Sequence, residues 1–219
     1  MFIDKNEVKR YLRLHGGDCG DIDELIEKLS QKALETLCPK SVINSFEIEH
    51  TQNGILLKGT DVSFEGNLVK KTFEGCDEVY VFAATLTLQS EMLLKQCFAK
   101  STVDGIVCDS VLTTMIEAYC DEIDEAVVKK GISKNKKATR RISCGYGDFS
   151  IKSQKDILDL LNAQKILGVK LNENNMMFPN KTVTAVMGIA PFDDKVTAEE
   201  ITVLKNKCQS CCASCDFKR

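Results

Sequence analysis

The chain has 219 residues, of which 43% are hydrophobic and 28% charged, the balance of a globular protein that can bury a core. A formal net charge of -3 argues against a protein that binds nucleic acid by neutralising phosphates, so we expect no nucleic-acid partner. The amino terminus has no apolar leader, and the longest apolar run, residues 79–88, is too short to cross a bilayer, which predicts a cytoplasmic protein without a membrane partner.

Two helices are predicted in the first forty residues. The first covers residues 4–14 and ends at Gly16-Gly17. The second begins at Asp21, which forms a capping box with Glu24, and continues until Pro39 stops it. Its apolar residues recur at helical spacing, and the stripe expected to be buried is Leu25, Ile26, Leu29, Ala33, Leu34 and Leu37.

From residue 41 the pattern favours strands. Apolar runs flank Gln52-Asn53-Gly54, and an Asn-Gly pair between such runs predicts a hairpin within residues 41–64. Residues 68–73 suit a short helix. The continuous apolar run of residues 79–84 is typical of a strand that is buried on both faces.

Two helices are predicted over residues 85–100 and 102–130, and the second carries an unusual charge. Between Ser110 and Cys120 the only charged residue is Glu117. A helix that is apolar nearly all round is usually buried, and a buried carboxylate needs a cationic partner or a proton. Glu117 is therefore either a solvated glutamate or a residue that faces a pocket and meets Arg141 or a cationic ligand group.

The last third of the chain combines loops, a helix and short strands. Residues 129–141 read as a solvated basic loop, and Ser153 caps a helix that ends at Gly168. Short strands at residues 176–178 and 182–189 flank a turn, and a last helix covers residues 198–207. We predict a single α+β domain over residues 1–207, with a mainly antiparallel sheet and flanking helices, followed by a cysteine-rich tail over residues 208–219.

The segment most suited to chemistry is residues 140–150, RRISCGYGDFS. Arg141 supplies a forked donor for a carboxylate or phosphate, and Ser143 adds a small hydroxyl. Gly145 and Gly147 flank Tyr146, so the backbone can turn tightly and come close to a ligand. The alternative interpretation is a plain glycine turn between two elements.

Four of the eleven cysteines lie together near the end of the chain, at Cys208, Cys211, Cys212 and Cys215. They could bind zinc or an iron–sulfur cluster, and ligation by Cys208, Cys211 and Cys215 is easier than ligation by all four adjacent thiolates. They could equally be free reactive thiols or form a redox disulfide. The other seven cysteines are scattered through apolar segments, as buried thiols are in a reducing compartment.

The chain resembles the activation domain of cobalamin-dependent methionine synthase, the module that binds S-adenosylmethionine. The family's Arg-x-x-x-Gly-Tyr signature is matched by Arg141, Gly145 and Tyr146. A helix similar to QKDILDLLNAQKILGVKL and a strand-turn-strand similar to MMFPNKTVTAVMGI follow it, and SVLTTMIEAYCDEIDEAV runs in register with the family's long helix, which places Glu117 on its ligand-binding glutamate. The resemblance covers residues 110–189.

This resemblance implies a set of ligand contacts. Arg141 would bind the carboxylate of S-adenosylmethionine, Glu117 would meet its ammonium or nearby polar groups, and the backbone at Ser143 with Tyr146 would frame it. An ungapped alignment of IDKNEVKRYLRLHG with the family's opening segment adds Asp4 as a further contact. The chain departs from the family pattern between Arg141 and Gly145, where prolines are replaced. It also has no Asp-x-His-x-x-Gly cobalamin motif, so it looks like a stand-alone relative.

The function that the resemblance implies is reductive reactivation. The domain would dock on a cobalamin-binding methionine synthase or corrinoid protein and present S-adenosylmethionine to inert cob(II)alamin, while flavodoxin or a reductase supplies one electron. The protein's contribution to such chemistry is to position the reactants. This accounts for the lack of a convincing pair of nucleophile and general base in the sequence. The alternatives are a metal or thiol-redox protein that acts through the cysteine tail and a scaffold that binds corrinoid proteins without a ligand.

Overall fold

The computed structural model of the chain describes residues 1–14 and 20–191. In these residues it has a mixed α and β architecture with an antiparallel sheet, as the sequence predicts. The elements in chain order are α1 (Lys5–Tyr11), α2 (Gly20–Thr36), β1 (Lys40–His50), β2 (Gly54–Leu57), β3 (Ser63–Glu65), α3 (Asn67–Thr72), β4 (Glu78–Thr85), α4 (Thr87–Lys100), α5 (Thr102–Ser133), β5 (Lys136–Ala138), α6 (Ser153–Leu160), α7 (Ala163–Leu167), β6 (Lys170–Leu171), β7 (Met177–Phe178) and β8 (Thr182–Pro191).

The chain divides into two compact units. The first unit contains Met1–Val42, Ala84–Glu122 and Asn162–Val183, and the second contains Ile43–Ala83, Ile123–Leu161 and the described residues from Thr184 onward. Each unit is assembled from three separate segments, and α5, β1, β4 and β8 each continue from one unit into the other. The predicted boundary between a domain ending at residue 207 and a tail lies outside the described residues and stays a prediction.

The first unit is built on helices. Helix α1 packs against α2, which in turn packs against α4. Two predictions about α2 are wrong. The helix already begins at Gly20, which leaves Asp21 inside the first turn and not at the cap. Leu34 is 42% exposed, because the buried face of α2 is narrower than the predicted stripe and consists of Ile26, Leu29, Ser30 and Ala33.

The turn before β8 is fixed to the helices of the first unit. The backbone N–H of Asn180 donates to Glu91 Oε1 over 2.6 Å. Lys181 Nζ pairs with Asp109 Oδ1 at 2.7 Å and donates to Thr113 Oγ1 at 2.7 Å. The buried Glu91 carboxylate of α4 is thus satisfied by the turn, as a buried polar group must be.

Strands flank this turn as predicted, because β7 precedes it and β8 follows it, and β7 pairs with β6 in a separate two-stranded sheet. The helix predicted from Ser153 to Gly168 is two helices, because Asn162 adopts a left-handed conformation with φ 50°. Asparagine tolerates this conformation better than most residues. The side chain of Ser153 makes no cap, since α6 starts after Lys152 without a side-chain hydrogen bond.

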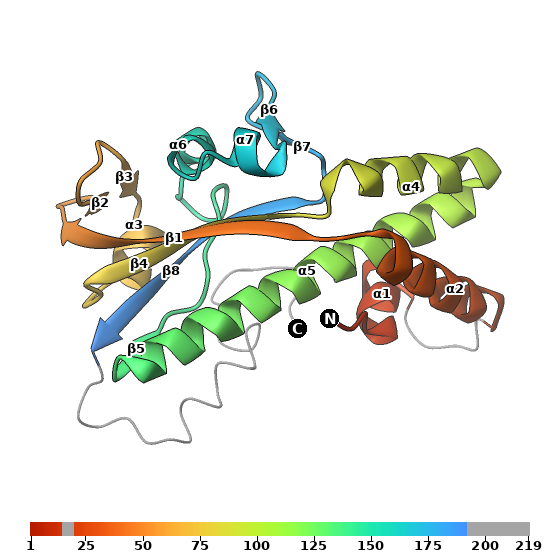
Figure 1. Cartoon of the computed structure of the whole chain (residues 1–219), viewed down its shortest axis with the longest axis horizontal. Helices are drawn as coiled ribbons and strands as arrows, with labels where there is room; N and C mark the ends of the chain where they lie inside the picture. The colour runs from red at the N-terminus through yellow and green to blue at the C-terminus, as the bar shows by residue number, and fades with distance from the viewer. Residues whose placement is uncertain (15–19, 192–219) are drawn as a thin grey trace. The chain divides into compact units, whose positions relative to one another are not determined.

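The second unit contains the main sheet, with strand order β3-β2-β1-β4-β8-β5 (Figure 1). The predicted hairpin is confirmed, because β1 and β2 are antiparallel with Ile48 opposite Leu57 and His50 opposite Ile55. The predicted buried strand is confirmed as β4, which lies between β1 and β8 and is buried from Val79 to Thr85. Helix α3 packs beside β2 and β3.

The basic segment after α5 is more ordered than its composition predicts. Helix α5 continues to Ser133, and β5 then pairs antiparallel with β8, with Ala138 opposite Ile189. Two lysines of this segment form ion pairs with acidic residues, since Lys134 pairs with Glu78 at 2.7 Å and Lys136 pairs with Asp77. The prediction of a solvated loop over residues 129–141 is therefore wrong for most of that range. None of the helices in residues 1–14 and 20–191 combines the length and apolar character needed to span a bilayer.

Candidate functional site

The segment around Arg141 is anchored to strand β8 on both sides. The Thr139 N–H donates to the Gly188 carbonyl over 2.8 Å. Ile142 and Val186 exchange two backbone hydrogen bonds, at 3.0 Å and 2.9 Å. Arg141 lies between these two anchors, so the path of its backbone is fixed by β8.

Beyond Ile142 the chain forms the predicted tight turn. Gly145 and Gly147 have φ values of 91° and 56°, which side chains rarely allow. The turn is closed by the Gly145 N–H, which donates to the Phe149 carbonyl at 2.8 Å, and by the Phe149 N–H, which donates to the Tyr146 carbonyl at 3.0 Å. Tyr146 stands at the tip of this turn with 68% of its surface exposed.

Apolar side chains hold the turn against the sheet. Phe149 is 1% exposed, and its ring meets the ring of Phe64 in β3 edge to face, with the centroids 5.4 Å apart. Ile142 and Cys144 are buried as well. Burial raises the pKa of the Cys144 thiol to about 12, so this thiol is protonated at neutral pH and contributes packing, not nucleophilic chemistry.

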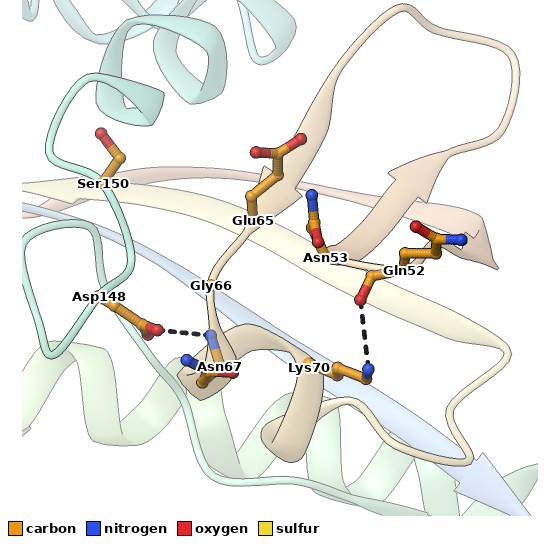
Figure 2. Close-up of a pocket in the computed structure, with 8 residues that line it drawn as sticks. All are labelled: Gln52, Asn53, Glu65, Gly66, Asn67, Lys70, Asp148 and Ser150. Carbon is orange, nitrogen blue, oxygen red and sulfur yellow. Dashed lines mark hydrogen bonds between the residues drawn. The ribbon is translucent and has the colours of Figure 1, made fainter.

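Asp148 joins the turn to helix α3. Its carboxylate accepts the backbone N–H of Asn67 at 2.6 Å, at the start of that helix (Figure 2). It also accepts the backbone N–H of Leu68 at 2.9 Å. These hydrogen bonds from Leu68 and Asn67 stabilise the ionised form and lower the pKa of Asp148 below its usual value. Asp148 was not among the predicted site residues.

The ionised Asp148 carboxylate should stabilise the fold in a pH-dependent way. A carboxyl with a lowered folded-state pKa stabilises the fold above its unfolded pKa of about 3.9, and this contribution is lost as the pH falls through the folded-state pKa. We expect Asp148→Asn to lower the thermal midpoint at neutral pH and to match wild type in acid, as measured by circular dichroism. Asp61→Asn, which changes an exposed carboxylate of the same unit, is the control. A deficit that persists unchanged in acid would contradict this role.

A polar hollow of about 400 Å³ lies beside Asp148. Figure 2 shows that Glu65, Asn53 and Ser150 extend to one side, while Lys70 Nζ donates to the Gln52 carbonyl at 3.2 Å. None of the predicted ligand residues lines this hollow, whose walls are Gln52, Asn53, Glu65, Gly66, Asn67, Lys70, Asp148 and Ser150. The hollow is therefore a neighbour of the predicted site and not the site itself.

The structure gives Arg141 a partner that the sequence analysis missed. Arg141 Nη1 donates to Asp124 Oδ2 over 2.9 Å, and the two side chains are 15% and 6% exposed. Asp124 lies on α5 in the second unit. The signal was present in the sequence, because Cys120, Asp124 and Val127 are four and three residues apart and all are buried, so the acid lies on a buried face of the helix.

The predicted ligand residues are divided between the two units. Arg141, Ser143, Gly145 and Tyr146 form one continuous loop in the second unit. In the first unit, Glu117 is half-buried in α5, and the Asp4 carboxylate accepts the Asn6 N–H at 2.8 Å as the cap of α1. The convergence of Glu117 and Asp4 with Arg141 on one ligand stays a prediction.

The four clustered cysteines, Cys208, Cys211, Cys212 and Cys215, lie outside the described residues. Within residues 1–14 and 20–191, no group of three or more histidine, cysteine, aspartate or glutamate side chains is placed to hold a metal ion. Most of the scattered cysteines in this part of the chain are buried, as predicted, and Cys38 is exposed.

No protein-family model matches the chain, and no curated protein matches it either. Among solved structures, the crystal structure of the MetH reactivation domain bound to AdoHcy is similar, with a TM-score of 0.64 and 18% sequence identity. The similarity covers 85% of this chain and 74% of that chain. This chain therefore has the fold of the MetH reactivation domain. The resemblance to the methionine synthase activation domain is confirmed at the level of the fold.

Proposed function

We propose that the chain binds S-adenosylmethionine and supports reductive methylation of cob(II)alamin on a separate cobalamin-binding methionine synthase or corrinoid protein. Flavodoxin or a reductase would supply the electron. One observation carries the proposal. The Arg-x-x-x-Gly-Tyr segment forms a loop that is fixed at both ends and exposes Tyr146, in a chain with the fold of a domain that binds AdoHcy. AdoHcy is S-adenosylmethionine without the transferable methyl group.

The loop residues suit the chemical groups of this ligand. A guanidinium offers several N–H donors in one plane, so the bond to Asp124 is compatible with a second, forked interaction with a carboxylate. The exposed ring of Tyr146 offers an apolar face, and the ligand can approach the backbone at Gly145 closely because glycine has no side chain. Glu117 and Asp4 would supply the negative charge that the ammonium group requires.

The work of the chain in this proposal is positioning. When bound, S-adenosylmethionine supplies an electrophilic methyl group for transfer to the cobalt of the partner's cobalamin. Arg141 would hold the carboxylate end of the ligand, and Tyr146 with the backbone at Ser143 would limit its movement and exclude water. No proton has to be removed by the chain, and the protonated Cys144 thiol agrees with a site that uses no cysteine nucleophile.

Calorimetric titration tests the binding step. We expect the full-length chain to bind S-adenosylmethionine saturably, with a Kd below about 1 mM. Arg141→Lys keeps the positive charge beside Asp124 but removes the forked donor, so it should weaken binding by about tenfold or more. Arg140→Lys changes the exposed neighbour and should bind like wild type. Absence of binding by the wild-type chain would remove the proposal.

The cysteine tail provides a second control for this titration. If the loop binds the ligand, a chain with Cys208, Cys211, Cys212 and Cys215 replaced by serine should bind S-adenosylmethionine as the wild type does. Zinc and iron analysis of protein purified without oxygen examines the alternative function at the same time. Stoichiometric metal, together with loss of ligand binding in the serine variant, would favour a protein that acts through its tail.

A further inference from the structure

We infer that Asp124 is a positioning residue that holds the Arg141 guanidinium in the orientation needed to bind the carboxylate of the ligand. This inference rests on the proposed function and extends it to a residue outside the signature loop. The contact that carries it is the 2.9 Å bond between Arg141 Nη1 and Asp124 Oδ2. The Asp124 side chain is 6% exposed, so the contact is not a loose pair on the surface.

Arg141 is held at both ends of its side chain. Its backbone is fixed by the hydrogen bonds of Thr139 and Ile142 to β8, and its guanidinium is fixed by Asp124 on α5. An arginine side chain that is exposed to solvent loses much conformational entropy when it binds a ligand. Here the chain has already lost that freedom on folding, which removes an entropic cost from ligand binding.

The Arg141–Asp124 pair should increase the affinity of some ligands and not of others. In this inference Asp124 acts on the ligand through the Arg141 guanidinium, so its contribution should appear with ligands that present a carboxylate to Arg141. S-adenosylmethionine and S-adenosylhomocysteine both carry this carboxylate, whereas 5′-methylthioadenosine has the same adenosine and no amino-acid part. A residue that merely stabilised the fold would affect all three ligands to the same extent.

The experiment measures the affinities of these three ligands for the full-length chain by calorimetry. Asp124→Asn keeps the shape of the side chain but replaces the charged acceptor by a neutral one. We expect this variant to bind both carboxylate ligands with about tenfold lower affinity. Its affinity for 5′-methylthioadenosine should change by less than about twofold. Glu125→Gln is the matched control, because it removes the neighbouring charge of α5, which pairs with Lys129 on the surface. It should bind all three ligands like wild type.

A second variant guards against loss of folding. Asp124→Glu keeps the negative charge that compensates Arg141 but moves the carboxylate, so it should show the same selective loss for the two carboxylate ligands. If wild type binds no S-adenosylmethionine, the proposed function fails and this inference fails with it. If wild type binds and both Asp124 variants bind equally well, or all three ligands weaken together, the positioning role alone is overturned.

Discussion

Replacing Arg141 by alanine is expected to lower the free energy of unfolding by about 3–5 kcal/mol, the range found when one member of a buried ion pair is removed. The substitution would leave the Asp124 carboxylate, which is 6% exposed, without the guanidinium that compensates its charge. Denaturant unfolding followed by circular dichroism measures this change. Ligand-binding experiments with this variant therefore need a matched measurement of folding.

Two further variants test whether the loss of stability comes from the uncompensated buried charge. Arg140→Ala removes the exposed neighbouring cation and should change stability by less than about 0.5 kcal/mol. Replacing both partners by apolar residues, as in Arg141→Met with Asp124→Leu, should be less harmful than Arg141→Ala because no buried charge is left uncompensated. An Arg141→Ala protein that is as stable as wild type would show that the pair is not buried in solution.

Replacing Phe149 by alanine should cost a similar amount, about 3–5 kcal/mol, as is usual for a fully buried phenylalanine. The ring contacts Phe64 and closes the turn that presents Tyr146, so its loss removes both core packing and the anchor of the loop. Denaturant unfolding gives the stability change. Phe178→Ala, at a position that is 48% exposed, serves as the control and should have a small effect. Equal effects of the two substitutions would mean that Phe149 is not a packing anchor.

Much of the fold could be predicted from local patterns. The Asn53-Gly54 pair predicted the β1–β2 hairpin because such pairs are typical of tight hairpin turns, and the hairpin is confirmed with Gly54 as the first residue of β2. The continuous apolar run in β4 predicted a strand buried on both faces, and the structure confirms it. These signals are reliable because each depends on residues close together in the sequence.

Pairings between distant segments could not be predicted in this way. Strand β5 was missed because Lys136 and Lys137 have no apolar alternation, and the strand forms through backbone pairing with β8 and ion pairs with distant acids. The pairing of β7 with β6 was not predicted, because a strand of two residues does not specify its partner. The break at Asn162 was missed because asparagine is tolerated both inside a helix and in a left-handed turn.

The candidate site was predicted only in part, because local patterns indicated the residues of the loop and not their distant partners. Arg141, Gly145 and Tyr146 lie within six residues of one loop, in which Gly145 and Tyr146 form the tight turn and Arg141 precedes it. Asp124 and Asp148, which fix the arginine and the turn, were missed because acids on a helix and after a glycine usually face solvent. Their partners are seventeen and about eighty residues away in the sequence, so the helical spacing of Cys120, Asp124 and Val127 could have indicated a buried acid but could not have identified its partner.

The turn separates the side chains that anchor it from those that would face a ligand. Ile142 and Phe149 are buried in the protein, whereas Ser143 and Tyr146 are partly or largely accessible. Changes at the accessible positions have little packing to disrupt, so natural selection could alter the preferred molecule without first compensating for a less stable scaffold. Proteins that diverged from a common ancestor with this scaffold could therefore recognise chemically different compounds.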